Sequence, residues 1–560
     1  MARRYRWIAL SNTTLAIFMS ALDGSIVIIA LPAIFRGIHL DPLAPGTFGY
    51  LLWMIMGYLL VQAVFVVTLG RLGDMMGRVR IYNFGFVFFT FASVLLSFDP
   101  FTGAHGAIWL IGWRLLQALG GSMLTANSAA ILTDAFPANQ RGFALGINQI
   151  SGLAGQFLGL VAGGILAIVD WRAVFWVNVP VGVFGTLWAY RSLREIGHHR
   201  SGRIDWLGNI TFALGLGALL VAVTFGIHPY GGHAMGWTNP ATLLMAAAGI
   251  SLLIAFVPIE RRAAEPMLDL QLLRIRGFSA GIFAALAAAI ARGGLQFMLV
   301  IWLQGIWLPL HGFPYARTPL WAGICLLPFS CGFMLAGPVS GHLSDRFGAR
   351  RFSTAGLLVF AASLVGLALL PVDFPYWAFA LCTGGAGIGT GMFAAPNTAA
   401  IMSSVPALQR GVASGMRSTA QNAGNLLSIG LSFSLMIIVL SYALPPAMIG
   451  GLVDKGVPEA IAREVASLPP VSSLFAAFLG LNPLEQLLSP TGVLASLDAA
   501  QRAALTGTSF FPNLIATPFH RGLIAVFAAA TTLSLLAAAA SYLRGPRAKV
   551  PQAQKRYDVA

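Results

Sequence analysis

Asp23 is the residue best placed to do chemistry in this chain of 560 residues. The chain has 19 Asp and Glu residues, and all of them except Asp23 lie in loops, near the ends of apolar segments or in the tails. A carboxylate in the apolar part of a bilayer costs about 3 kcal/mol, so such a residue faces protein or water and is often functional. We therefore expect Asp23 to bind and release a proton. The alternative is a structural aspartate that neighbouring Asn or Ser side chains satisfy.

Two polar strips cross apolar segments in the second half of the chain. Arg417 is followed by Gln421 and Asn425 at intervals of four residues, so the three lie on one face of a helix. Arg292 and Gln296 form a shorter strip of the same kind. Guanidinium and amide groups in an apolar segment can bind a polar part of a substrate, and we expect all five residues to line a substrate cavity. The alternative is that they hold neighbouring helices together.

Other chemistries have no supporting motif. The chain contains neither a G-x(4)-G-K-[ST] loop for nucleotide phosphates nor an H-E-x-x-H pair for zinc. Its three cysteines, Cys325, Cys331 and Cys382, form no C-x-x-C pair. The glycines from Gly385 to Gly391 match a dinucleotide fingerprint in letters only, because they lie in an apolar segment with no strand before it. We expect no metal, no ATP, no other cofactor and no enzymatic active site.

The composition requires that these residues be positioned by membrane-spanning helices. Apolar residues make up 57% of the chain and charged residues only 9%, which is too few to cover a soluble surface. A bilayer core of about 30 Å is crossed by about 20 apolar residues in a helix, where every backbone polar group is satisfied. Fourteen segments meet this condition, and they predict an all-α integral membrane protein: residues 8–35, 48–70, 81–98, 107–133, 143–168, 173–190, 206–227, 240–259, 278–305, 320–341, 354–371, 376–402, 412–443 and 522–543.

The positive charges predict the orientation. With the N-terminus in the cytoplasm, 24 of the 34 Lys and Arg residues fall on the cytoplasmic side, seven on the opposite side and three inside helices. Lys and Arg are retained on the cytoplasmic side, so both termini are predicted to be cytoplasmic in a multi-pass protein of the plasma (inner) membrane. The same asymmetry accounts for the net charge of +15 without a nucleic-acid partner.

An internal repeat divides the chain. Three pairs of segments match at an offset of about 270 residues: 70–77 with 341–348, 127–131 with 397–401, and 137–142 with 406–411. Equivalent helices are eight apart, and an even number preserves direction, so the repeats are parallel. We predict an N-terminal six-helix bundle (1–192), two inserted helices with their loops (193–277), and a C-terminal six-helix bundle (278–560) related to the first by a pseudo-twofold axis. Residues 444–520 form an extracytoplasmic insertion, interpreted as short amphipathic helices at the outer surface.

Several motifs together resemble the major facilitator superfamily, and specifically its fourteen-helix drug:proton antiporter branch. The resemblance covers nearly the whole chain except the insertion. It is carried by Leu22–Pro32 in the first helix, Trp53 and Tyr58 in the second, the loop Gly70–Arg80, Arg114–Gly121 in the fourth, Gly155–Gly164 in the fifth, Trp171-Arg172, and Asn178–Gly182. Met75, Val79, Ala118 and Leu160 depart from the residues usual in these motifs.

The resemblance implies roles for residues of the first bundle. Asp23 is then the proton carrier, and Arg114 lies near it and favours release of the proton; the alternative is an arginine that holds helix carbonyls. Trp53 and Tyr58 are expected to line the substrate cavity. Gly155, Gly159, Gly163 and Gly164 place small residues along helix 5, so that it packs closely against a helix of the other bundle and seals the inner end.

Two repeated loops are expected to gate the conformational change. They combine tight glycine turns with acids at helix N-termini, and so hold the bundles together on the cytoplasmic side. The residues concerned are Gly70, Asp74, Gly77, Arg78, Asp345 and Gly348. A plain solvated turn is the alternative for both aspartates.

The function expected is proton-coupled antiport, with export of amphiphilic small molecules or drugs by alternating access. At 100 mV and one pH unit a proton supplies about 2.3 and about 1.4 kcal/mol, enough for several hundredfold accumulation of a neutral solute. Three intramembrane arginines against one acid favour a neutral or acidic cargo over a permanent cation. The protein is expected to act as a monomer among membrane lipids. The alternatives are a dedicated lipid or lipophilic-metabolite exporter, if the insertion caps the outer leaflet, and, from another class, a non-transporting membrane receptor.

Overall fold

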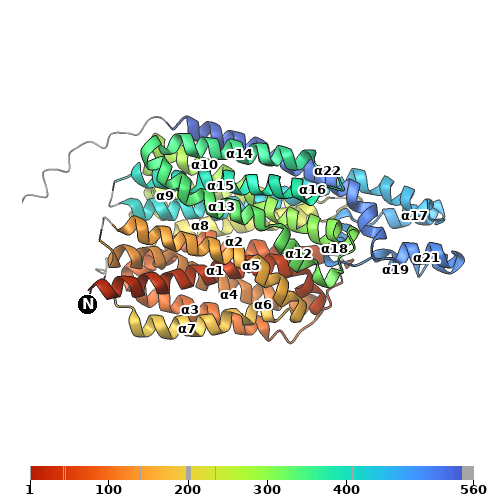
Figure 1. Ribbon diagram of the computed structural model, residues 1–560, viewed down its shortest axis with the longest axis horizontal. Coiled ribbons are helices and arrows are strands. Elements are labelled where there is room, and N and C mark those ends of the chain that lie inside the picture. The colour runs from red at the N-terminus through yellow and green to blue at the C-terminus, as the bar shows by residue number, and fades with distance from the viewer. Residues whose placement is uncertain are drawn as a thin grey trace, which may run out of the picture.

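The computed structural model describes residues 2–41, 43–44, 46–137, 140–196, 204–233, 235–406 and 409–544, and these are helical except for short connections (Figure 1). Fourteen helical segments are long and apolar enough to cross a membrane, and they correspond to the predicted ones. In the described residues the only β pairing is an isolated bridge between Tyr230 and His233. The side chain of Asp345 lies outside the described set.

The spans of the first bundle are α1 (Ala2–Gly37), α2 (Thr47–Met76), α3 (Arg78–Ser97), α4 (Gly103–Ala135), α5 (Arg141–Val169), and α6 (Ala173–Trp176) with α7 (Asn178–Ser192). The inserted pair is α8 (Trp206–Ile227) and α9 (Pro240–Arg262). The second bundle comprises α10 (Arg276–Trp302), α12 (Thr318–Cys325) with α13 (Leu327–Phe347), α14 (Ala349–Leu369), α15 (Tyr376–Ser403), α16 (Arg410–Val453) and α22 (Phe510–Tyr542).

The two bundles are built from the same helix pairings, as the repeat predicts. In the first bundle α1 packs on α5, α2 and α3 pack on α4, and α3 packs on α7. In the second, α10 packs on α16, α13 and α14 pack on α15, and α14 packs on α22. The chain is therefore two equivalent six-helix bundles with two further helices between them in sequence.

We call the end of the molecule where the chain begins the inner end and the opposite end the outer end, following the predicted orientation. The bundles meet along two seams. On one side α2 packs against α16 from Val67 and Gly415 near the inner end to Phe48 and Phe433 near the outer end. On the other side α5 packs against α12, which lies in the outer half.

The inserted pair packs on the first of these seams. α8 contacts α9, α2 and α16, and the side chain of Val223 on α8 lies where a Cβ on Gly430 of α16 would be placed. The segment after α9 is also tied to α2, because Arg71 forms an ion pair with Glu265 and donates to the carbonyl of Pro266 (3.1 Å). The pair is thus attached to both bundles.

The long insertion is shorter than predicted and is not all at the surface. α16 continues through Pro445 and Pro446 to Val453, and α22 begins at Phe510, so separate elements occupy only the residues between them. These are α17 (Glu459–Ala466), α18 (Pro470–Leu479), α19 (Pro483–Leu488), α20 (Val493–Ser496) and α21 (Ala499–Thr506). α17, α19 and α21 project at the outer end (Figure 1). α18 corrects the expectation of surface helices, because all ten of its residues are buried.

An irregular turn interrupts the span that begins with α10. α10 is followed by a π-helical turn, η2 (Leu303–Trp307), and a short α11 (Leu308–Leu310) within the same span. Wide turns of this kind are rare and frequently lie at functional sites. The turn contacts α18 and α22.

Candidate functional site

Asp23 lies at the centre of the first bundle and is fully buried. Its carboxylate forms an ion pair with Arg114 of α4. It also accepts hydrogen bonds from the side-chain amides of Gln117 (3.0 Å) and Asn178 (2.7 Å). The carboxylate therefore faces protein and not lipid, and three donors from α4 and α7 satisfy it.

Arg114 is equally enclosed, with 3% of its surface exposed. Besides Asp23 it donates to the side-chain oxygen of Gln117, and its guanidinium lies over the ring of Tyr58 with 4.2 Å from Cζ to the ring centroid. Gln117 in turn donates to the hydroxyl of Ser93 (2.9 Å). Five of the six spans of the first bundle, those of α1, α2, α3, α4 and α7, thus contribute a side chain to one polar cluster.

Asp23 and Arg114 were predicted to lie close together, and the structure brings them into direct contact. Tyr58, which was predicted to line the substrate cavity, stacks on Arg114 and is buried. Ser93 was missed because nothing distinguishes it from other serines in apolar helices. Asn178 lies in a recognised motif but had no predicted role; its position opposite Asp23 depends on how α7 packs.

The remaining predicted cavity residues are half-buried side chains on three helices, namely Trp53 on α2, Arg292 and Gln296 on α10, and Arg417, Gln421 and Asn425 on α16. α10 and α16 pack together where the backbone of Asn425 approaches Gly293, the residue after Arg292. Arg417 donates to the side-chain oxygen of Gln421 (3.0 Å). Among the described residues neither Arg292 nor Arg417 has a carboxylate partner.

The glycines of α5 correct one expectation. A Cβ at Gly155, Gly159 or Gly163 would lie 2.3 to 2.9 Å from backbone atoms of α1, in the same bundle rather than the other one. Gly164 does face the other bundle, where a Cβ would lie 2.3 Å from Cα of Leu320 on α12. This contact is near the outer end, because Gly164 lies in the last two turns of α5. The first three glycines therefore hold α5 against α1. The contact of α5 with the other bundle, at Gly164, is at the outer end and not at the inner one.

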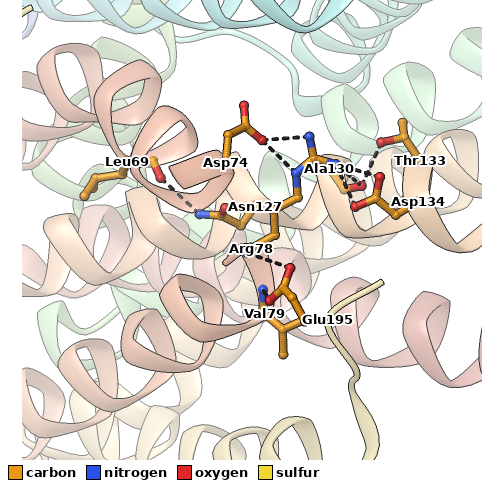
Figure 2. A network of polar contacts seen from close by, with 9 residues as sticks. All are labelled: Leu69, Asp74, Arg78, Val79, Asn127, Ala130, Thr133, Asp134 and Glu195. Carbon is orange, nitrogen blue, oxygen red and sulfur yellow. Dashed lines mark hydrogen bonds and ion pairs between the residues drawn. The ribbon is translucent and has the colours of Figure 1, made fainter. Parts of the chain in front are cut away.

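A second polar network lies at the inner end, around the loop between α2 and α3 (Figure 2). Arg78 forms ion pairs with Asp74 of α2 and Asp134 of α4, both at 2.7 Å. Asn127 of α4 donates to the carbonyl of Leu69 (3.3 Å) and its side chain fills the space where a Cβ on Gly73 would lie. These contacts join α2, α3 and α4 within the first bundle.

The acid at the N-terminus of α3 is Glu195 and not Asp74. Its two carboxylate oxygens accept from the backbone amides of Arg78 and Val79, both at 3.0 Å (Figure 2). Asp74 instead lies in the last turn of α2 and binds Arg78. Glu195 and Asp134 were missed, because neither is part of the recognised loop motif. The network corrects the expected contact between bundles, since its described members all belong to the first one.

The tight turns were predicted correctly for two glycines. Gly77 and Gly348 have φ of +108° and +90° and separate α2 from α3 and α13 from α14. Side chains rarely adopt these angles, so glycine is required there. Gly70 instead lies inside α2. The predicted role of Asp345 falls on a side chain outside the described residues.

Comparisons with known proteins agree with this architecture. The family model described as Major Facilitator Superfamily matches residues 13–429. The chain is 29% identical to the riboflavin transporter RibZ of Clostridioides difficile (strain 630) over 444 residues, which cover 78% of this chain and 90% of the relative. It is 32% identical to the multidrug resistance protein Stp of Mycobacterium tuberculosis (strain CDC 1551 / Oshkosh) over 476 residues, 82% of this chain and 81% of the relative.

A solved structure has the same fold. It is a bacterial homologue of the human lysosomal transporter Spinster, in an inward-facing and unoccupied conformation. The TM-score is 0.57 with 16% sequence identity, and the match covers 96% of this chain and 97% of that one.

Proposed function

This chain belongs to the Major Facilitator Superfamily of transporters, and we propose that it is a proton-coupled antiporter that exports amphiphilic small molecules. It acts as a monomer in the plasma (inner) membrane, with both termini in the cytoplasm. The proton motive force drives export, without ATP or another cofactor. The multidrug resistance relative supports a broad cargo range, and the riboflavin transporter relative supports planar aromatic cargo.

The observation that carries the proposal is the polar cluster around Asp23. The contact between a buried carboxylate and a buried guanidinium depends on protonation, since a proton on the carboxylate removes the charge that Arg114 neutralises. Loss of the ion pair releases Arg114 toward Tyr58 and Gln117, its other two neighbours. Because these groups come from different helices, protonation changes how the helices of the first bundle are held together.

The cluster is also next to the helix contact that must move. Gly159 of α5 lies against Leu22 and Ser25 of α1, on either side of Asp23. α5 continues to Gly164, where it closes on the second bundle. A change in the charge of Asp23 therefore acts on α1. Because α1 packs closely on α5, it also acts on the α5–α12 seam. Alternating access follows when the α5–α12 seam opens with Asp23 in one protonation state and closes with Asp23 in the other.

The cargo is neutral or acidic. Arg114 is neutralised by Asp23, whereas Arg292 and Arg417 have no carboxylate partner among the described residues. Guanidinium groups remain charged in proteins, so these two favour an anionic group on the cargo and disfavour a permanent cation. A dedicated lipid exporter gains no support from the insertion, because α18 is buried within the protein and does not lie over the leaflet.

Transport by the purified protein in vesicles tests the proposal with three fluorescent probes: anilinonaphthalene sulfonate (anionic), phenylnaphthylamine (neutral) and ethidium (cationic). We expect a pH gradient to drive the first two against their concentration gradients. Asp23→Asn removes the titratable group while keeping its shape, and should abolish uphill movement but retain downhill exchange. Asp41→Asn, at an exposed loop carboxylate, is the control and should behave as wild type. Uphill transport by Asp23→Asn at the wild-type rate contradicts the proton role.

A further inference from the structure

α18 is a buried helix inside an extramembrane insertion. Its residues, Pro470–Leu479, are all buried, although loops that connect spans normally run over the surface. Pro469 precedes it, and Gly480 follows in the left-handed conformation with φ of +73°. With ten residues it spans about 15 Å, too short to cross a bilayer. α18 contacts α1 and α2 of the first bundle and α16 and η2 of the second.

Two phenylalanines of α18 and four of the bundles form a continuous cluster of six rings at the outer end. Phe475 of α18 packs edge to face on Phe35 of α1 (5.7 Å between centroids) and on Phe48 of α2 (5.9 Å). Phe48 continues to Phe433 of α16 (5.0 Å). The rings of both bundles are therefore joined partly through a ring that belongs to the insertion.

The cluster closes on itself through a second ring of α18. Phe433 packs on Phe297 of α10 (5.3 Å), and Phe297 packs on Phe478 (5.8 Å), one helical turn from Phe475. All six rings are at most 4% exposed. Aromatic rings in offset and edge-to-face contact attract one another beyond the area they bury, so this set is a cohesive apolar barrier.

The irregular part of the α10 span lies beside the same barrier. A Cβ on Gly305, in the π-helical turn, would lie 3.1 Å from the carbonyl oxygen of Ala477 on α18. Gln304, the residue before it, donates across the bundle interface to the carbonyl of Ile29 on α1 (3.1 Å). A wide turn, a cross-bundle hydrogen bond and α18 therefore meet at one point.

We propose that α18 is the outer gate of the transport path, with Phe475 and Phe478 as its sealing residues. The inference rests on the proposed export function. A cargo that leaves between the bundles at the outer end must separate Phe35 and Phe48 from Phe297 and Phe433, and α18 packs on both pairs through Phe475 and Phe478. Because α18 lies in the chain between α16 and α22 of the second bundle, opening withdraws it from Phe35 and Phe48 of the first bundle, and the connections around Pro469 and Gly480 absorb the movement. An aromatic cargo offsets the lost ring contacts with its own.

A permanently packed α18 is the competing explanation, and two cysteine experiments separate the two. Both start from a Cys325→Ala, Cys331→Ala, Cys382→Ala background. In the first, Phe35→Cys and Phe475→Cys are joined by a short bis-methanethiosulfonate, which forms a reducible disulfide with each thiol and fixes α18 to α1. The cross-linked protein should transport phenylnaphthylamine about tenfold more slowly than the same protein after reduction. Glu459→Cys with Arg463→Cys is the control, because these exposed residues pair within α17 (2.6 Å) and do not bridge to a bundle.

The second experiment follows exposure of α18 directly. Ser473 is 1% exposed, and Ser473→Cys is nearly isosteric. A membrane-impermeant maleimide added outside should label this thiol about tenfold faster under a pH gradient than without one. Arg463→Cys, on exposed α17, should be labelled equally in both conditions.

The outcomes distinguish this inference from the proposed function. Full transport by the cross-linked protein, or labelling of Ser473→Cys that is unaffected by the gradient, overturns the gate. Failure of the cysteine-free background to move any of the three probes uphill counts against the proposed function. Labelling still decides the gate in that case, because it reports movement of α18 without cargo.

Discussion

At the residue scale, the two bundles treat charge differently. In the first bundle Asp23 and Arg114 neutralise one another inside a cluster of amide and hydroxyl groups. In the second, neither Arg292 nor Arg417 has a carboxylate partner among the described residues. Under the proposed function, we therefore expect the first bundle to handle the proton and the second to bind a polar group of the cargo.

Arg292→Gln and Arg417→Gln test the second of these roles. Each keeps a hydrogen-bonding side chain and removes a positive charge, so transport of anilinonaphthalene sulfonate should fall about tenfold, the effect of losing one charge-assisted hydrogen bond of about 1.5 kcal/mol. Transport of phenylnaphthylamine, which lacks the sulfonate, should change little. Arg317→Gln, at an exposed arginine of the outer loop, is the control. Equal loss for both probes means that the arginines hold the helices together.

Asp99 provides a test of stability against pH. It lies between α3 and α4, where burial raises the pKa of its carboxyl, with opposition from the Phe101 amide that it accepts (2.9 Å) and from the charge of Arg172. A raised pKa in the folded state means that the carboxyl favours folding at acid pH, and this contribution is lost as pH rises through the folded-state pKa. Asp99→Asn keeps an acceptor for Phe101 and carries no charge.

We therefore expect Asp99→Asn to have the same or a higher Tm than wild type at pH 8, with the difference shrinking or reversing near pH 4. Thermal unfolding in detergent measures this. Asp41→Asn is a matched control, because Asp41 accepts from the amide two residues later at the same distance, 2.9 Å, but is exposed. A clear drop in Tm for Asp99→Asn at pH 8 contradicts the assignment.

The sequence predicted part of the polar cluster. Asp23 and Arg114 stand out because charged residues in long apolar segments are costly. Ser93 and Asn178 do not, because Ser and Asn are common in such helices and only the packing of α3 and α7 brings them to Asp23. Tyr58 was assigned to the cavity because a motif gives the helix on which a ring lies, but not the neighbour on which it stacks.

At the element scale, the N-terminus of α3 is held by a residue far along the chain. Glu195 follows α7 and caps the amides of Arg78 and Val79, where a carboxylate also interacts favourably with the helix dipole. Tyr5 of α1 donates to the carbonyl of Arg194 (2.8 Å), which fixes the same segment. The start of α3 thus depends on contacts with both α1 and the end of α7.

Glu195→Ala should destabilise the protein by about 1 kcal/mol, the usual effect of losing a helix cap. Glu195→Gln keeps one acceptor and should lose less. Thermal unfolding in detergent gives the order of the three proteins, and Glu464→Ala, at an exposed glutamate of α17, is the control. An unchanged Tm for Glu195→Ala indicates that water replaces the cap.

The fourteen spans were predictable, and α18 was not. A segment of about 20 apolar residues has one physical solution in a bilayer, but ten apolar residues fit a surface, a core or an interface equally well. The glycines of α5 show the same limit. Their spacing predicts a close helix contact, but α1 and a helix of the other bundle are both able to supply the partner.

At the scale of the whole molecule, the α5–α12 seam depends on two glycines. A Cβ at Gly164 would lie 2.3 Å from Cα of Leu320, and one at Gly323 would lie 2.5 Å from the carbonyl oxygen of Leu160. The two backbones therefore touch at this seam, and a methyl group at either position must separate them.

Gly164→Ala should shift the protein toward a state in which the α5–α12 seam is open. Leu160 lies at this seam, because its carbonyl would meet a Cβ on Gly323, and it is 1% exposed, so labelling of Leu160→Cys by an impermeant maleimide reports this opening in a Cys325→Ala, Cys331→Ala, Cys382→Ala background. We expect labelling about tenfold faster than without the Gly164 substitution. Gly112→Ala is the control, because a Cβ there meets no atom within 4 Å. The same labelling rate in all three proteins means that the seam absorbs the methyl group.

The position of the inserted helices has a consequence for the direction of motion. α8 contacts α2 and α16 together, and Arg71 ties the end of the pair to α2 by an ion pair and a carbonyl, whereas the α5–α12 seam has no comparable attachment among the described residues. A rotation that opened both seams equally would break helix contacts on both sides, but it would also have to strain the attachment through α8 and Arg71 on one side. We therefore expect the pivot of the proposed transport cycle to be displaced toward α8, and the larger excursion to belong to the side of α5 and α12.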